Sequence, residues 1–227
     1  MTELNEILTK FRDCGWDLIA GPAGDWLDGK GDYNVLLAAV KQADEECGSC
    51  GCDFDPLYRR VLEILDLAKK LPPCTLLCHT CFGLHGGAIS THARILEQLY
   101  EGWYEGHVAG YGPNPAPQQQ ERLKSIENFN KTLQELQRTG CEGCRINHAS
   151  HGGCIPGCRI CTCTEQHGVL WCADCPEFPC NPEGIVPENV LGRWNRGNLE
   201  IRETGALEFF RKNEFVGHYA WCKGTGN

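Results

Sequence analysis

Apolar side chains recur every three to four residues along much of the chain, which is the period of an amphipathic helix. The clearest case follows Asp55-Pro56, an expected N-cap with proline at the first helical position. The pattern predicts helices over residues 4–11, capped by Thr2, and over 33–46, 57–71, 89–104, 118–138 and, with interruptions at Gly197 and Gly205, 187–213. Residues 167–171 are a candidate β-strand, so the expected fold is mainly α with few or no β-strands.

The segments between these helices are rich in glycine and, in three places, in cysteine. Residues 20–34 are expected to form a loop, and residues 106–117 a linker or surface loop. Residues 47–52, 74–87 and 141–180 show almost no helical pattern and are expected to be irregular cysteine-rich loops. Such loops bury little apolar surface and need cross-links. We expect two domains: a helical N-terminal extension over 1–72 and a cysteine-rich metal-binding domain over 73–227.

Cysteine makes up 17 of the 227 residues, and this odd number cannot pair completely within one chain. No run of about 18 apolar residues is present, and acids stand at the N-terminus where a signal peptide carries bases. We therefore expect a cytoplasmic protein with no membrane partner. In that reducing compartment, clustered cysteines are metal ligands or redox groups rather than disulfides.

The net charge is −9, and the acidic excess is concentrated in the first 70 residues. No basic patch is visible in the sequence. Because proteins bind duplex nucleic acid by neutralising its phosphates, we expect no nucleic-acid partner.

The densest group of cysteines lies between residues 141 and 180. Two-residue spacers, as in Cys141-x2-Cys144 and Cys172-x2-Cys175, let two sulfurs point at one ion. The predicted metal ligands of this segment are Cys141, Cys144, Cys154, Cys158, Cys161, Cys163, Cys172, Cys175 and Cys180. Such thiolates hold tetrahedral zinc or iron–sulfur clusters, and the spacing alone does not choose between them.

A second group has the spacing Cys74-x3-Cys78-x2-Cys81 and supplies three further predicted ligands. In radical S-adenosylmethionine enzymes this spacing holds a cluster with one open iron. Here Thr80 replaces the aromatic residue that usually precedes the third cysteine, and no run of βα units follows. Structural or electron-transfer ligation is therefore the favoured interpretation.

The third group, Cys47-x2-Cys50-x-Cys52, can form a metal site with Cys14 or with a ligand from another loop. Four histidines lie in or near the cysteine segments and can complete a site of three cysteines and one histidine: His79, His85, His148 and His151. Cys222 stands alone and is expected to be a small buried apolar residue rather than a ligand.

Residues 74–219 resemble the bacterial and archaeal family catalogued as domain of unknown function 3795. The resemblance rests on three motifs: Cys74-x3-Cys78-x2-Cys81 followed by a helix, Cys141-Glu-Gly-Cys144-Arg145, and Cys172-x2-Cys175 followed by Glu177-Phe178-Pro179-Cys180. Residues 198–205 are similar to the family's closing helix. The resemblance implies a cysteine-rich metal-binding fold and no particular activity. Cys161, the 118–138 helix and the N-terminal extension depart from the family pattern.

Three functions fit these observations. The first is an iron–sulfur protein, with 4Fe–4S clusters, that transfers electrons or serves as a small accessory subunit of an anaerobic redox complex. Its partner would be a redox enzyme or another subunit, docked on the acidic N-terminal part or on Trp103, Tyr104 and Tyr111. The second is a zinc-binding structural or interaction protein. The third is a metalloenzyme with an open site near Cys74–Cys81, for which the sequence indicates no substrate.

Overall fold

The computed structural model describes residues 2–151, 155, 158–180, 186 and 188–223. Over these residues the protein is mainly α-helical, with irregular cysteine-rich segments between the helices, and the predicted fold class is confirmed. The only β-type pairing among them is an isolated bridge between Leu84 and Cys141. Two compact units are present: residues 1–78 with 142–227, and residues 79–141. The domain boundary expected after residue 72 stays a prediction.

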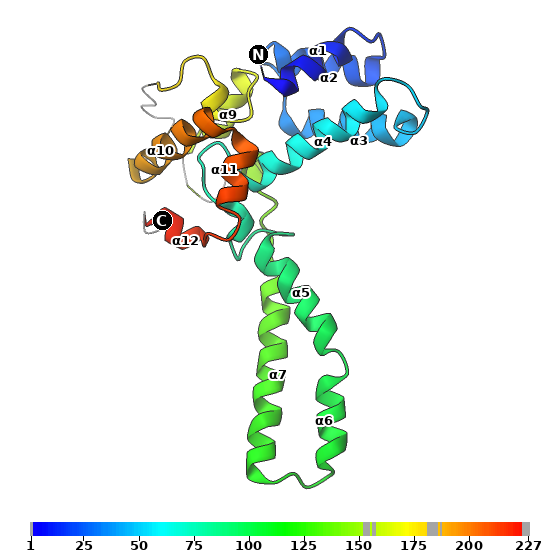
Figure 1. Ribbon diagram of the computed structural model, residues 1–227, viewed down its shortest axis with the longest axis vertical. Helices are drawn as coiled ribbons and strands as arrows, with labels where there is room; N and C mark the ends of the chain where they lie inside the picture. The colour runs from blue at the N-terminus through cyan, green and yellow to red at the C-terminus, as the bar shows by residue number, and fades with distance from the viewer. Residues whose placement is uncertain (1, 152–154, 156–157, 181–185, 187, 224–227) are drawn as a thin grey trace. The chain divides into compact units, whose positions relative to one another are not determined.

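The larger unit contains most of the helices (Figure 1). They are α1 (Glu3–Arg12), α2 (Asp17–Leu27), α3 (Tyr33–Cys47), α4 (Asp55–Lys70), α8 (Cys144–His151), α9 (Ile160–Gln166), α10 (Glu188–Thr204), α11 (Ala206–Lys212) and α12 (His218–Cys222), with a 3-10 turn η2 (Cys172–Asp174). A second 3-10 turn, η1 (Cys78–Thr80), spans the boundary between the units. Thr2 caps α1 as predicted, because its hydroxyl accepts a hydrogen bond from the Asn5 amide at 3.2 Å.

Residues 20–34 are not the loop that their glycines and aspartates predict, because most of them belong to α2. Ile19, Ala23 and Trp26 lie at helical spacing and are fully buried against the other N-terminal helices. Burying this stripe outweighs the weak helix propensity of Gly21, Pro22 and Gly24, since packing supplies most of a helix's stability in a protein.

Four other segments also differ from their prediction. The predicted helix 89–104 is two helices, α5 (Ala88–Tyr100) and α6 (Trp103–Tyr111), separated at Gly102, whose φ of 74° is left-handed. The first half of the expected 106–117 linker is therefore helical. Residues 141–180 include α8 and α9, although they lack a helical apolar pattern. Residues 167–171 form no strand.

Helix α10 runs through Gly197 without the predicted interruption. A Cβ at Gly197 would lie 2.4–2.7 Å from side-chain atoms of Thr75, so glycine lets the helix approach the cysteine loop closely. Gly205, with a φ of 86°, does separate α10 from α11.

Three tryptophans join distant segments of the larger unit around one core. The indole of Trp26 donates to the Gly168 carbonyl at 3.1 Å, and that of Trp171 donates to the Leu71 carbonyl at 2.8 Å. The indole of Trp221 donates to the Thr75 carbonyl at 2.7 Å. These buried bonds tie the N-terminal helices to the cysteine-rich region, so residues 1–78 and 142–227 share a single core.

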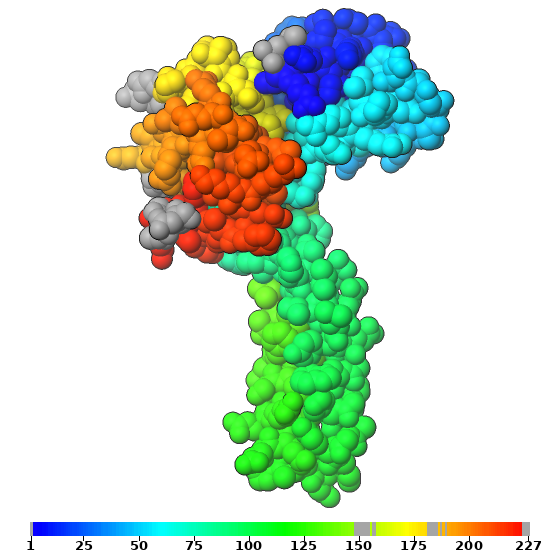
Figure 2. All heavy atoms as spheres, in the orientation of Figure 1, coloured from blue at the N-terminus to red at the C-terminus, as the bar shows by residue number. Residues whose placement is uncertain are grey.

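The smaller unit is a helical hairpin in which α7 (Pro117–Gln137) runs beside α5 and α6. The space-filling view in Figure 2 shows that side chains fill the space between these ribbons. Ala93, Ile126 and Leu133 are buried, and the rings of Tyr100 and Phe129 lie 5.1 Å apart. No helix among the described residues is long and apolar enough to cross a membrane.

Candidate metal centres

Cys47, Cys50, Cys52 and Asp55 bring their ligand atoms within 4.8 Å of one another. The Cys47 sulfur lies 3.1 Å from that of Cys50 and 4.0 Å from that of Cys52. One carboxylate oxygen of Asp55 lies 3.4 Å from both the Cys50 and the Cys52 sulfur. The three predicted cysteines are thus brought together, and the fourth donor is an aspartate that sequence reasoning had assigned to a helix cap.

The junction between α3 and α4 positions this group. Cys47 is the last residue of α3, and Gly51, with a φ of 82°, turns the chain back toward α4. Phe54, not Asp55, is the N-cap of α4, so Asp55 is its first helical residue and turns its carboxylate to the thiols. The Gly51 amide donates to this carboxylate at 2.7 Å, and that bond lowers the pKa of Asp55. The group therefore presents an ionised oxygen donor beside three thiols.

These distances suit one tetrahedral ion. Zinc binds thiolate sulfur at about 2.3 Å and carboxylate oxygen at about 2.0–2.2 Å, which places neighbouring donors about 3.4–3.8 Å apart. The sulfur–sulfur and sulfur–oxygen distances given above span 3.1–4.0 Å. The residues present can hold a single ion with four protein donors.

A cluster of aromatic rings lies next to this group. The ring of Phe11 stacks on that of Tyr58 at 5.2 Å, and the Phe54 ring lies 6.1 Å from Phe11. Burial, and after it the nearby thiols of the group and of Cys14, together raise the pKa of Tyr58 to about 12. Cys14 therefore lies in the same neighbourhood, but its sulfur accepts a hydrogen bond from the Trp16 amide at 3.4 Å, and it is not one of the four donors.

A second group of thiols forms where α9 meets the Cys172–Cys180 segment. The pKa of Cys172 is raised to about 12, chiefly by burial. The hydrogen bond from the Trp194 indole opposes this rise, and the thiols of Cys163, Cys180 and Cys175 add to it. Cys163, Cys175 and Cys180 are thus the thiols that act electrostatically on Cys172, whereas the group found with all ligand atoms within 4.8 Å among the described residues is that of Cys47, Cys50, Cys52 and Asp55. His167 lies at the edge of the group, with Nε2 3.4 Å from a Glu177 oxygen.

Helix α10 holds the cysteine segment through side chains four residues apart. The Trp194 indole donates to the Cys172 sulfur at 3.2 Å, and Asn198 accepts from the Ala173 amide at 3.0 Å. Arg202 donates to the Ala173, Cys175 and Phe178 carbonyls at 2.9, 2.8 and 2.5 Å. Sequence reasoning missed these residues; their signal is the four-residue spacing of polar groups on an otherwise amphipathic helix.

A third set of thiols involves the loop before η1. The pKa of Cys161 is raised to about 12, chiefly by burial. The charge of Arg145 opposes this rise, and the thiols of Cys74 and Cys158 add to it. Cys74 and Cys78 are buried in the larger unit, whereas Cys81 belongs to the smaller one. The common site predicted for Cys74, Cys78 and Cys81 stays a prediction.

The remaining candidates divide between described and undescribed positions. Cys141 is partly buried, and its carbonyl accepts from the His85 amide at 2.8 Å, while Cys144 begins α8. His79 is buried in η1 and His85 is exposed. Cys154 and the side chains of His148 and His151 lie outside the described residues. Cys222 is exposed rather than buried, and its sulfur accepts from Arg193 at 3.4 Å.

The fold and these thiol groups define a helical, cysteine-rich protein with a candidate metal centre in its N-terminal part. Residues 70–183, half of the chain, match the family described as "Protein of unknown function (DUF3795)". The chain belongs to this family, as the cysteine motifs predicted. No curated protein and no solved structure matches the chain. The Cys47–Asp55 group lies outside the matched residues, whereas the Cys163–Cys180 group lies within them.

Proposed function

We propose that this protein is a zinc-binding protein in which the metal stabilises a helical scaffold that binds another protein. The observation that carries the proposal is the convergence of Cys47, Cys50, Cys52 and Asp55, with all ligand atoms within 4.8 Å. Three thiolates and one carboxylate are a donor set that zinc accepts.

The donor distances favour one ion over an iron–sulfur cluster at this group. In a 4Fe–4S cluster, each cysteine binds a different iron atom, so the sulfurs stand apart around a bulky inorganic core. Here the Cys47 and Cys50 sulfurs are only 3.1 Å apart. The carboxylate of Asp55 as fourth donor also departs from the all-cysteine ligation that is usual for clusters.

A zinc ion at this position would have a structural role. Among residues 48–53 only Gly48 is buried, and it has no side chain. No side chain of this segment therefore anchors the α3–α4 junction through apolar contacts. A metal bond between the end of α3 and the start of α4 would supply that cross-link, because the free energy of binding adds to that of folding. Four protein donors leave no open position, which is the arrangement of structural rather than catalytic zinc.

Iron–sulfur chemistry is the second candidate, and it concerns the group of Cys163, Cys172, Cys175 and Cys180. Four thiols that influence one another's pKa are a donor set for a 4Fe–4S cluster as well as for zinc. With a cluster there, the protein would transfer electrons or act as an accessory subunit of a redox complex. The buried Trp194 indole, which donates to the Cys172 sulfur, would tune the potential.

The proposed protein partner, a redox enzyme or another subunit, fits the surface of the hairpin unit. Leu99 is 74% exposed and Phe82 is 54% exposed. Trp103 is 37% exposed, and its ring lies edge-on to Tyr100 at 5.0 Å and tilted against His107 at 4.3 Å. Large apolar side chains at the surface favour contact with another protein. A cytoplasmic location, where thiols stay reduced, is part of the same proposal.

Metal analysis of the full chain, purified without oxygen from cells supplied with both zinc and iron, tests these proposals. We expect at least one zinc ion per chain that resists dialysis. Absence of tightly bound zinc would overturn the first proposal. About four iron atoms with matching acid-labile sulfide, lost in Cys172→Ser, would establish the second candidate, and a colourless protein without iron would end it.

A further inference from the structure

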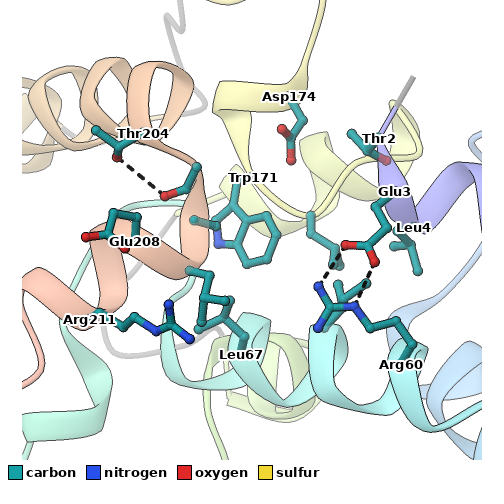
Figure 3. Close-up of a pocket in the computed structure, with 15 residues that line it drawn as sticks. Thr2, Glu3, Leu4, Arg60, Leu67, Trp171, Asp174, Thr204, Glu208 and Arg211 are labelled. Carbon is teal, nitrogen blue, oxygen red and sulfur yellow. Dashed lines mark hydrogen bonds and ion pairs between the residues drawn. The ribbon is translucent and has the colours of Figure 1, made fainter.

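A cavity of about 540 Å³ opens on the larger unit, away from the Cys47–Asp55 group. Its wall is built by the start of α1, one face of α4, residues 170–174 and the junction of α10 with α11 (Figure 3). The volume is typical of sites that bind small molecules. No step of the proposed metal function uses this cavity.

The indole of Trp171 lies at the centre of the cavity wall, between the two charged sides of the site. Its Nε1 donates to the Leu71 carbonyl at 2.8 Å, which fixes the ring, and Leu67 and Leu170 continue the apolar surface around it. A fixed aromatic ring with aliphatic neighbours is a platform for an apolar group of a ligand.

One side of the cavity carries an ion pair that is already complete. Arg60 donates to both carboxylate oxygens of Glu3, at 2.7 and 2.8 Å, and to Glu63 at 2.9 Å. These bonds lower the pKa of Glu3 and use three nitrogens of the guanidinium. Arg60 therefore forms part of the wall and is not an open binding group.

Asp174 and Arg211 are different, because neither side chain makes a hydrogen bond or ion pair within the part of the chain that the structure describes. Figure 3 shows them on opposite sides of the Trp171 indole. Asp174 carries a carboxylate and Arg211 a guanidinium, and both line the cavity. The cavity thus offers one anionic and one cationic group across an apolar platform.

We propose that this cavity binds a short peptide with free ends and an apolar side chain. The ammonium group pairs with Asp174, the terminal carboxylate pairs with Arg211, and the side chain lies on Trp171. An extended chain spans about 3.3–3.6 Å per residue, so two or three residues bridge charges on opposite sides of an indole. Arginine suits the carboxylate end because its guanidinium donates two parallel hydrogen bonds.

Titration calorimetry with leucyl-leucine at pH 7, where the peptide's amino group is mostly protonated, tests the proposal in the metal-loaded full chain. The two matched probes are N-acetyl-leucyl-leucine, which lacks the ammonium, and leucyl-leucinamide, which lacks the carboxylate. We expect saturable binding of the free dipeptide and about tenfold weaker binding of each blocked form, the size of one charge-assisted hydrogen bond. No binding of the free dipeptide, or equal binding of all three, would overturn the proposal.

Two variants connect each end of the peptide to its residue. Asp174→Asn should weaken binding of the free dipeptide about tenfold and leave binding of the acetylated form unchanged. Arg211→Gln should weaken binding of the free dipeptide about tenfold and leave binding of the amidated form unchanged. Arg138→Gln, a highly exposed arginine in the other unit, is the control and should change nothing. If either cavity variant weakens all three probes equally, the assigned contacts are wrong. Unchanged zinc content in both variants separates this test from that of the metal sites.

Discussion

Asp55→Asn is the variant that probes the proposed zinc site most selectively. The substitution keeps the shape of the side chain but replaces an anionic oxygen donor, 3.4 Å from two of the sulfurs, by a neutral amide. Losing even a group that only supports a metal ligand costs about 10–100-fold in affinity, and the loss of a ligand should cost at least as much. At saturating zinc, a 10–100-fold loss of zinc affinity lowers the free energy of unfolding by about 1.4–2.7 kcal/mol.

The assay is thermal unfolding of the full chain in a zinc buffer and again after chelation. For a chain of this size, 1 kcal/mol shifts Tm by about 2–4 °C, so we expect a loss of about 3–10 °C with zinc present. After chelation the difference should shrink to the small contribution of an acid in the first turn of α4, about 0.3–1 kcal/mol.

Asp53→Asn is the matched control, since Asp53 is exposed and two residues away. It should leave the zinc-dependent Tm unchanged. If Asp55→Asn lowers Tm equally with and without zinc, Asp55 acts through the helix alone, and its place among the ligands is refuted.

Three further predictions concern other parts of the larger unit. Gly197→Ala should lower the unfolding free energy by about 1–2 kcal/mol in urea melts, because its Cβ would meet a side-chain oxygen at 2.4 Å. Gly192→Ala, in an open position of α10, should be neutral or stabilising; equal effects of the two would contradict the close approach. Burial lowers the pKa of His218 in the folded protein. As pH falls through about 6.5, the unfolded chain therefore binds a proton at His218 before the folded protein does, and the free energy of unfolding decreases. His218→Asn should flatten this part of the stability profile, and an unchanged profile would exclude His218 as its source. Cys172→Ser should lower metal content and Tm together, whereas Cys222→Ser, at an exposed position, should change neither; intact metal content in Cys172→Ser would show that Cys172 is not a ligand.

The helices with strong apolar periods were predictable from the sequence alone. Helices α1, α3, α4 and α7 match their predicted ranges within about two residues, since each presents a continuous apolar stripe. Helix α2 was not predictable, because its glycines and Pro22 signal a loop and only its burial in the core makes it helical. Helices α8 and α9 are only eight and seven residues long, too short to show a repeated apolar period in the sequence.

The candidate metal site was only partly predictable. Spacing indicated Cys47, Cys50 and Cys52, but it carried no signal that separates an aspartate ligand from an aspartate N-cap. A shift of one residue in the start of α4, from Asp55 to Phe54 as cap, decides that question. The support of the Cys172–Cys180 segment by Trp194, Asn198 and Arg202 is a tertiary contact between distant segments, which local patterns do not encode.

The central claim is that Cys47, Cys50, Cys52 and Asp55 together hold one zinc ion. The most direct test is the zinc content of the wild-type chain and of a triple Cys47/Cys50/Cys52→Ser variant, both purified without oxygen and dialysed in parallel. The account predicts that the variant holds one zinc ion fewer per chain while keeping any metal bound elsewhere. Equal zinc content in the two proteins, or a loss of iron and sulfide in place of zinc, would contradict it.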